Sequence, residues 1–181
     1  ATRYRGDALG AEFRGGFFVC EFNTHQVNFT RLNAQGSTYA AERIDFLHSD
    51  SIDCHPTDVL EDADGSLLVI DTGGWFRYGC PTSQVAKPEI TGAIYRIRRT
   101  AAATVNDPLG LTVDWSAATH KQLATLLLDH RVAVRERATE QLIERGAAAI
   151  PTLLAVAISS DEDSCARATW ALHRLGEPAR N

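Results

Sequence analysis

Up to about residue 99, apolar residues occur in short runs separated by polar turns, which is the pattern of an antiparallel β segment. Residues 17–22 and 27–32 are rich in Phe and Val, and the polar residues 23–26 between them predict a hairpin. Residues 38–47 mix apolar and charged side chains, as a half-exposed strand does. Three strands in succession are therefore expected before residue 48.

A second β unit follows at residues 58–97. Residues 58–61 lead into the turn Asp62-Ala63-Asp64-Gly65, where glycine supplies positive φ, and residues 67–71 form a buried strand. Residues 92–97 close the unit as another strand. The intervening loop of about twenty residues, 72–91, is long for a compact domain, and loops of that length are often functional.

The last third of the chain carries a helical repeat. Arg137-Ala138-Thr139, Leu142 and Gly146 recur thirty positions later as Arg167-Ala168-Thr169, Leu172 and Gly176. Apolar spacing predicts four helices from Ser116, with Ser116 capping the first and Ser160 or Asp161 the fourth. Residues 116–181 resemble HEAT-type repeats, and small Ala138 and Ala168 let neighbouring helices approach closely.

The predicted fold class is α+β by segment. It consists of a β segment at residues 1–99, a linker at 100–115 rich in alanine and containing Asn106-Asp107-Pro108, and a helical solenoid at 116–181. The chain contains no methionine and begins with Ala1, so we expect it to be a piece of a longer protein.

Charge and hydropathy exclude two classes of partner. The net charge is -5, from 23 acidic residues against 18 Lys and Arg, and no basic run is long enough to track phosphates, so we expect no nucleic-acid partner. No stretch approaches the roughly 20 apolar residues of a membrane span. The predicted partner is the remainder of a larger protein or another protein.

The four cysteines form no CxxC or CxxCH pair, which excludes haem attachment within this chain. Cys54 and Cys80 flank the long loop and would form a disulfide in an oxidising compartment, whereas four reduced thiols are equally compatible with the pattern. His48, Cys54, His55 and Cys80 lack paired short spacings, and the Asp62–Gly65 turn lacks EF-hand spacing. No metal site is therefore predicted.

Residues at the borders of the long loop are the candidates for chemistry. His55 precedes Pro56 at a loop mouth, where it would act as acid or base or orient the following strand. Asp71 ends the buried strand, where it would serve a site or cap the glycine turn. Trp75, Arg77 and Tyr78 would stack on a sugar or cofactor ring, or anchor the loop. No hydrolase, NTPase, zinc-protease or dinucleotide motif occurs.

Residues 55–75, 79–84, 87–89 and 92–97 resemble a family of large bacterial exported proteins described as membrane-bound dehydrogenases. Members combine a β-propeller similar to sugar and sorbosone dehydrogenases, HEAT repeats and, commonly, a terminal CxxCH haem domain. Residues 5–7 and 13–21 resemble the preceding blade. The resemblance implies that this chain holds the last propeller blades and the first HEAT repeats, in a periplasmic or otherwise exported protein.

The resemblance adds Asp58, with Asp71, to the positions that match the family, and His55, Asp58 and Asp71 are the catalytic candidates. A six-bladed propeller needs about 250 residues and this chain offers about 95 of β sequence. No cofactor is expected within the chain, because haem or quinone chemistry would require sequence outside it.

The leading interpretation is a carboxy-proximal piece of an exported propeller-plus-HEAT protein that does not catalyse a reaction alone, so whether it serves an enzyme stays open. The alternative is a non-enzymatic interaction module that works through the groove of its helical repeats. A third interpretation is a complete domain whose β half is a small sheet.

Overall fold

The chain forms two compact units, one of strands and one of helices, as the α+β prediction requires. The computed structural model describes residues 1–75, 87–159 and 161–176. The first unit, here the β unit, is Ala1–Thr104, and the second, the helical unit, is Val105–Asn181. All described strands lie in the β unit and all described α-helices lie in the helical unit.

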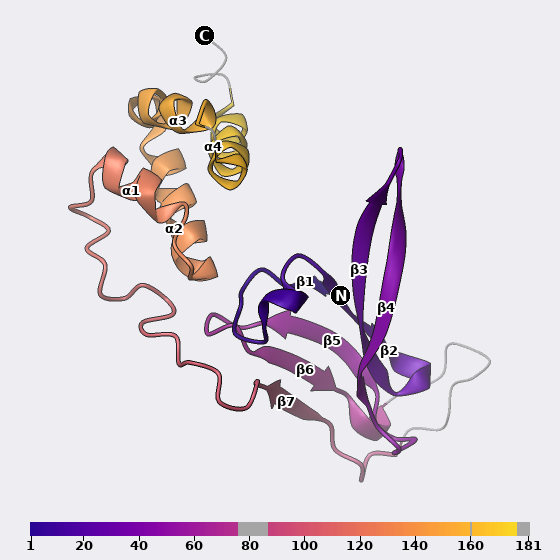
Figure 1. The fold of residues 1–181 in the computed structure, drawn as a ribbon. Coiled ribbons are helices and arrows are strands. Elements are labelled where there is room, and N and C mark those ends of the chain that lie inside the picture. The colour runs from indigo at the N-terminus through magenta and orange to yellow at the C-terminus, as the bar shows by residue number, and fades with distance from the viewer. Residues whose placement is uncertain (76–86, 160, 177–181) are drawn as a thin grey trace. The chain divides into compact units, whose positions relative to one another are not determined.

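A four-stranded antiparallel sheet in the order β1-β2-β3-β4 opens the β unit. Its strands follow one another in sequence as a meander: β1 (Thr2–Arg3), β2 (Phe17–Glu21), β3 (Gln26–Gln35) and β4 (Thr38–His48). Figure 1 shows β3 and β4 as a long hairpin that extends past the other strands. The predicted hairpin at residues 17–32 and the third strand are confirmed.

A three-stranded antiparallel meander follows, in the order β5-β6-β7. Its strands are β5 (Pro56–Glu61), β6 (Leu67–Asp71) and β7 (Ala93–Ile97). The β5–β6 turn places Gly65 at φ 77°, as predicted. Arg96 pairs with Asp62 at 2.6 Å and Arg98 pairs with Asp64 at 2.7 Å, so arginines neutralise the acidic turn.

One hydrophobic core joins the two sheets. It contains alternate residues of the strands, because successive side chains of a strand point to opposite faces. The fully or almost fully buried members are Tyr4, Leu9, Phe18, Val27, Phe29, Val59, Leu67 and Val69. Phe18 lies at its centre, with its ring centroid 4.7–5.8 Å from those of Tyr4, Phe13, Phe29 and Phe46.

The N-terminal segment is attached to the β5–β6 turn by buried polar groups. The Glu61 side chain, 3 % exposed, accepts hydrogen bonds from the backbone N–H groups of Arg5 and Gly6. The Tyr4 hydroxyl donates to Gly65 O and accepts from Leu9 N–H, and burial raises the pKa of Tyr4 to about 12. The segment before β2 is therefore part of the same folded unit.

The faces of the two sheets that point away from this core carry both apolar and polar side chains. On the three-stranded sheet, cross-strand register places Leu60, Leu68, Ile70 and Ile94 on one outer face, and Ile94 is 68 % exposed. On the four-stranded sheet, alternation gives an outer face that contains Phe17 and Val19 at its base and Leu32, Ala34, Tyr39 and Ala41 along the hairpin. Asp58 and Arg96 share the first of these faces, and Thr30, Arg43 and Asp45 share the second, so each outer face combines an apolar patch with polar and charged residues.

The helical unit packs four helices around a second core. The helices are α1 (His120–Leu126), α2 (Val132–Glu144), α3 (Ile150–Ala157) and α4 (Glu162–Leu175). Ala138, Leu142 and Ala168 are completely buried, as the repeat predicts, while Leu172 is half-buried. Asp161 caps α4 by accepting from Ser164 N–H, which confirms one of the two predicted caps.

Two boundaries differ from the sequence prediction. Thr119 rather than Ser116 caps α1, because Thr119 and Gln122 form a reciprocal capping box while the Ser116 hydroxyl donates to Asp114. Residues 105–115, assigned to the linker, belong to the helical unit. There the Trp115 indole is buried and donates to Gly110 O, and Arg131 pairs with Asp107.

Acid should weaken the helical unit. Hydrogen bonds from Thr112 and Leu111, with the Arg131 charge, hold the pKa of Asp107 below its ordinary value of 3.8, and the bond from Arg131 does the same for Asp129. Because the folded pKa lies below the unfolded one, this stabilisation is present above about pH 4 and is lost as the pH falls through the folded pKa.

Thermal melts followed by circular dichroism should show this loss as a fall in melting temperature at low pH. In Asp107→Asn the melting temperature should depend less on pH below 4, and an unchanged dependence would contradict this assignment.

Candidate functional site

Three connections of the β unit bring together a group of side chains that we call the histidine cluster. It consists of Phe22 and His25 from the β2–β3 connection, Cys54 and His55 from the β4–β5 connection, and Asp71 and Gly73 at the end of β6. Two of the three predicted catalytic residues, His55 and Asp71, are therefore in contact.

Asp71 holds the cluster together through its carboxylate. Asp71 Oδ1 accepts from the backbone N–H of His55 at 2.7 Å and from that of Gly73 at 2.8 Å, and the residue is 8 % exposed. Gly73 has φ 56°, and a Cβ there would lie 2.8 Å from backbone atoms of residues 90–92. Of the two roles considered for Asp71, the structure shows the capping one, and a catalytic role stays a prediction.

The ring of His55 is fixed by two contacts. Its Nδ1 lies 2.7 Å from Gly73 O, and its ring stacks on Phe22 with centroids 4.4 Å apart. A carbonyl oxygen only accepts hydrogen bonds, so Nδ1 carries the proton. In the neutral imidazole the lone pair is then on Nε2, which is the atom able to act as a base or ligand.

The ring of His25 makes the same kind of hydrogen bond, although His25 was not a candidate from the sequence. Its Nδ1 lies 2.7 Å from the backbone oxygen of Cys54, which again assigns the lone pair to Nε2. The His25 and His55 ring centroids are 5.4 Å apart. His25 has φ 57°, a left-handed conformation that is uncommon for residues other than glycine. In the sequence His25 is one of four polar residues in a hairpin loop, and nothing there marks its approach to His55.

Cys54 lies beside Asp71. Burial is the main cause that raises the pKa of the Cys54 thiol, and the nearby Asp71 carboxylate raises it further. A hydrogen bond with Ser49 lowers the pKa but does not cancel these effects. Cys54 is a free cysteine, and Cys80 lies outside the described residues, so the predicted Cys54–Cys80 bridge stays a prediction. A neutral thiol is a weak nucleophile, which argues against a role for Cys54 as an attacking group at neutral pH.

The remaining predicted residues are placed elsewhere or not described. Asp58 lies on β5. Its Oδ1 accepts a hydrogen bond from the backbone N–H of Val59 and lies 3.8 Å from the amino nitrogen of Ala1. Its side chain is 48 % exposed on the outer face of the three-stranded sheet. Arg77, Tyr78 and the side chain of Trp75 lie outside the described residues, so the stacking surface predicted from them stays a prediction.

Removing the Asp71 carboxylate should destabilise the β unit. In Asp71→Ala the buried N–H of Gly73 and the partly buried N–H of His55 lose their acceptor, and leaving a buried N–H unpaired costs about 1–3 kcal/mol. Asp71→Asn keeps an oxygen at the same position and should lose less than half as much. Urea unfolding followed by circular dichroism measures both values. Equal losses for the two variants would mean that the oxygen's hydrogen bonds are not what Asp71 contributes.

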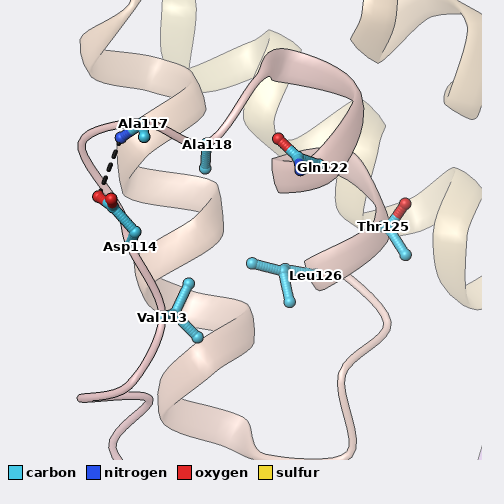
Figure 2. A pocket seen from close by; sticks show the side chains of 7 residues that line it. All are labelled: Val113, Asp114, Ala117, Ala118, Gln122, Thr125 and Leu126. Atoms are coloured by element: carbon cyan, nitrogen blue, oxygen red, sulfur yellow. Dashed lines mark hydrogen bonds between the residues drawn. The ribbon is translucent and has the colours of Figure 1, made fainter.

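A separate pocket lies in the helical unit, between residues 113–118 and one face of α1 (Figure 2). Its volume is about 440 Å³, within the range of small-ligand pockets. Val113, Ala117, Ala118 and Leu126 give it apolar walls, and Asp114, Gln122 and Thr125 supply polar groups. Hydrogen bonds from Ser116 and Ala117 lower the pKa of Asp114, so its carboxylate is charged at neutral pH.

Within residues 1–75, 87–159 and 161–176, no group of three or more His, Cys, Asp or Glu side chains is arranged to hold a metal ion. No helix in the same part of the chain combines the length and apolar character that crossing a bilayer requires.

Comparison with known protein families gives a match to the β unit. A family model described as a domain of unknown function matches residues 1–101, more than half of the chain. The match ends close to the boundary between the β unit and the helical unit. Neither a curated protein nor a solved structure matches the chain.

Proposed function

The chain belongs to the DUF7133 family, and we propose that its β unit is an open sector of a larger β-propeller in an exported propeller-plus-HEAT protein. In this proposal the histidine cluster forms part of a ligand-binding edge, and the chain does not catalyse a reaction by itself. The observation that carries the proposal is that each sheet has a buried inner face and an outer face with exposed apolar residues, among them Ile94 and Tyr39.

The architecture of the β unit supports this proposal. Propeller blades are small antiparallel sheets placed side by side around an axis. Here two successive meanders share one core, and both sheets remain open in the described residues. In a larger propeller, the outer face of each sheet would pack on the next blade as the inner faces pack on each other.

The ligand-binding part of the proposal rests on the histidine cluster. It brings side chains from three connections to one place, and His55 and His25 each present an Nε2 lone pair there. The resemblance to sugar dehydrogenases makes a sugar-like substrate the first class to test. Haem or quinone chemistry would need residues from outside this chain.

A charge on the outer face of the three-stranded sheet tests the sector proposal. We expect the purified chain to self-associate and to bind a hydrophobic dye through its outer faces. Ile94→Glu should reduce both self-association and dye binding. The melting temperature should change by less than about 3 °C, because Ile94 is largely exposed. Light scattering and dye fluorescence measure the two effects.

Ile52→Glu is the matched control, since Ile52 is 59 % exposed but lies on a connection rather than on a sheet face. It should leave association and dye binding unchanged. If the parent chain is monomeric and binds no dye, or if both substitutions act alike, the outer face of the three-stranded sheet does not function as a blade interface.

The pocket beside α1 favours a second candidate function, a protein-interaction module. Under this alternative the helical unit binds a partner segment through Val113, Ala118 and Leu126, with Asp114 at the rim (Figure 2). Leu126→Glu should then remove crosslinking to a protein partner while Ile94→Glu leaves it unchanged. The sector proposal predicts the opposite pattern for crosslinks to other blades of the longer protein.

A further inference from the structure

Two histidines of the histidine cluster have ring contacts that are typical of metal-binding histidines. We propose that His25 and His55 together bind one divalent transition-metal ion, of the Zn²⁺, Ni²⁺ or Cu²⁺ class, through their Nε2 atoms. This inference is independent of the propeller proposal, because both residues and their supports belong to the described β unit.

The hydrogen bonds of the two rings provide the first argument. A metal-binding histidine usually donates its other ring N–H to a carbonyl or carboxylate, which fixes the tautomer and orients the ring. His25 Nδ1 is 2.7 Å from Cys54 O and His55 Nδ1 is 2.7 Å from Gly73 O. In both rings Nδ1 therefore donates to a backbone carbonyl, as in metal-binding histidines, and the lone pair on Nε2 is available to bind the ion.

The separation of the rings provides the second argument. Zinc binds imidazole nitrogen at about 2.0–2.1 Å with tetrahedral angles, which places the centroids of two imidazoles on one ion about 5 Å apart. The observed centroid distance is 5.4 Å. The two rings are therefore close enough together for one ion to bind both.

The supports of the rings provide the third argument. Phe22 stacks on the His55 ring, and Asp71 fixes the His55 backbone. His25 is held at φ 57°, and such strained conformations concentrate at functional sites. Rings held in place before binding lose little side-chain entropy when the ion arrives.

Two protein ligands leave coordination positions open. No third His, Cys, Asp or Glu within the described ranges completes a group around these rings. Catalytic zinc sites keep one position open beside three protein ligands, and here two positions would hold water or a bound ligand. The affinity should therefore be lower than that of a closed structural site. Imidazole ligands favour Zn²⁺, Cu²⁺ and Ni²⁺ over Mg²⁺ and Ca²⁺.

Asparagine substitutions isolate the role of Nε2. Asn carries a side-chain N–H donor near the position of histidine Nδ1 and lacks Nε2, and it tolerates the left-handed backbone of His25. Titration calorimetry of the full chain with Zn²⁺ should give one site. In His25→Asn and in His55→Asn the affinity should fall by more than about tenfold, since loss of even a second-shell partner costs that much. His48→Asn, an exposed histidine, is the control and should bind as the parent does.

Spectra and folding complete the test. Co²⁺ bound at this site should show ligand-field bands without a thiolate charge-transfer band, because the proposed protein ligands are nitrogens. Circular dichroism melts without metal identify any variant that has simply unfolded, and His55→Gln then replaces His55→Asn. Absence of one-site Zn²⁺ binding, equal binding in all three asparagine variants, or a thiolate band would each overturn the proposal.

Discussion

Phe18→Ala should destabilise the β unit by about 3–5 kcal/mol, the range for deletion of a completely buried phenylalanine. Phe18 is at the centre of the core shared by the two sheets and contacts four other aromatic rings. Its loss leaves a cavity that those rings fill only in part. Urea unfolding of the purified chain, followed by circular dichroism at strand wavelengths, measures the change.

Phe17→Ala is the control for this prediction, since it removes the same atoms one residue earlier. Phe17 is half-buried on the outer face of the same strand. Its substitution should cost less than half as much as Phe18→Ala. Equal losses would show that the outer face is packed as tightly as the core, which is incompatible with an open sector.

Leu142→Ala should destabilise the helical unit by about 2–5 kcal/mol. Leu142 lies on α2, is completely buried and belongs to the core that α1, α3 and α4 share. The substitution removes buried apolar surface and leaves a cavity among helices, while leucine and alanine differ little in helix propensity. Thermal melting of the helical signal measures the effect.

Leu154→Ala on α3 makes the same chemical change at a position that is 51 % exposed. We expect a loss of less than about 1 kcal/mol, because surface positions away from caps and networks contribute little. Similar losses at the two positions would contradict the assignment of Leu142 to the interior of the repeat.

Strands β2 to β7 were predictable because strand sequences carry their signal locally, whereas the two-residue strand β1 and the order of the strands in each sheet were not. Alternating or continuous apolar runs and glycine turns at residues 17–32 and 58–71 identify strands without knowledge of neighbours. The repeat that pairs Ala138 with Ala168 predicted two buried small residues, and both are completely buried. The first cap was misassigned, because Ser116 and Thr119 are both good capping residues and only the bond to Gln122 selects one.

The histidine cluster was predictable only in part. His55 and Asp71 were candidates because each lies at a loop border, a position that is visible in the sequence. His25 was not, since its contact with His55 joins residues thirty positions apart and depends on a left-handed turn. Long-range contacts of this kind leave no periodic trace in a single sequence.

The amino-acid sequence by itself determined the element types, the α+β division and the repeat, because these depend on side-chain periodicity and turn chemistry within a few residues. Tertiary structure alone decided which residues are brought together. Asp71 accepts a hydrogen bond from the His55 backbone, His25 lies beside His55, residues 105–115 belong to the helical unit, and exposed apolar residues such as Ile94 remain on the outer faces of the sheets. The physical reason is that alternation in a strand gives each sheet two faces, and only packing determines which of them a neighbour covers.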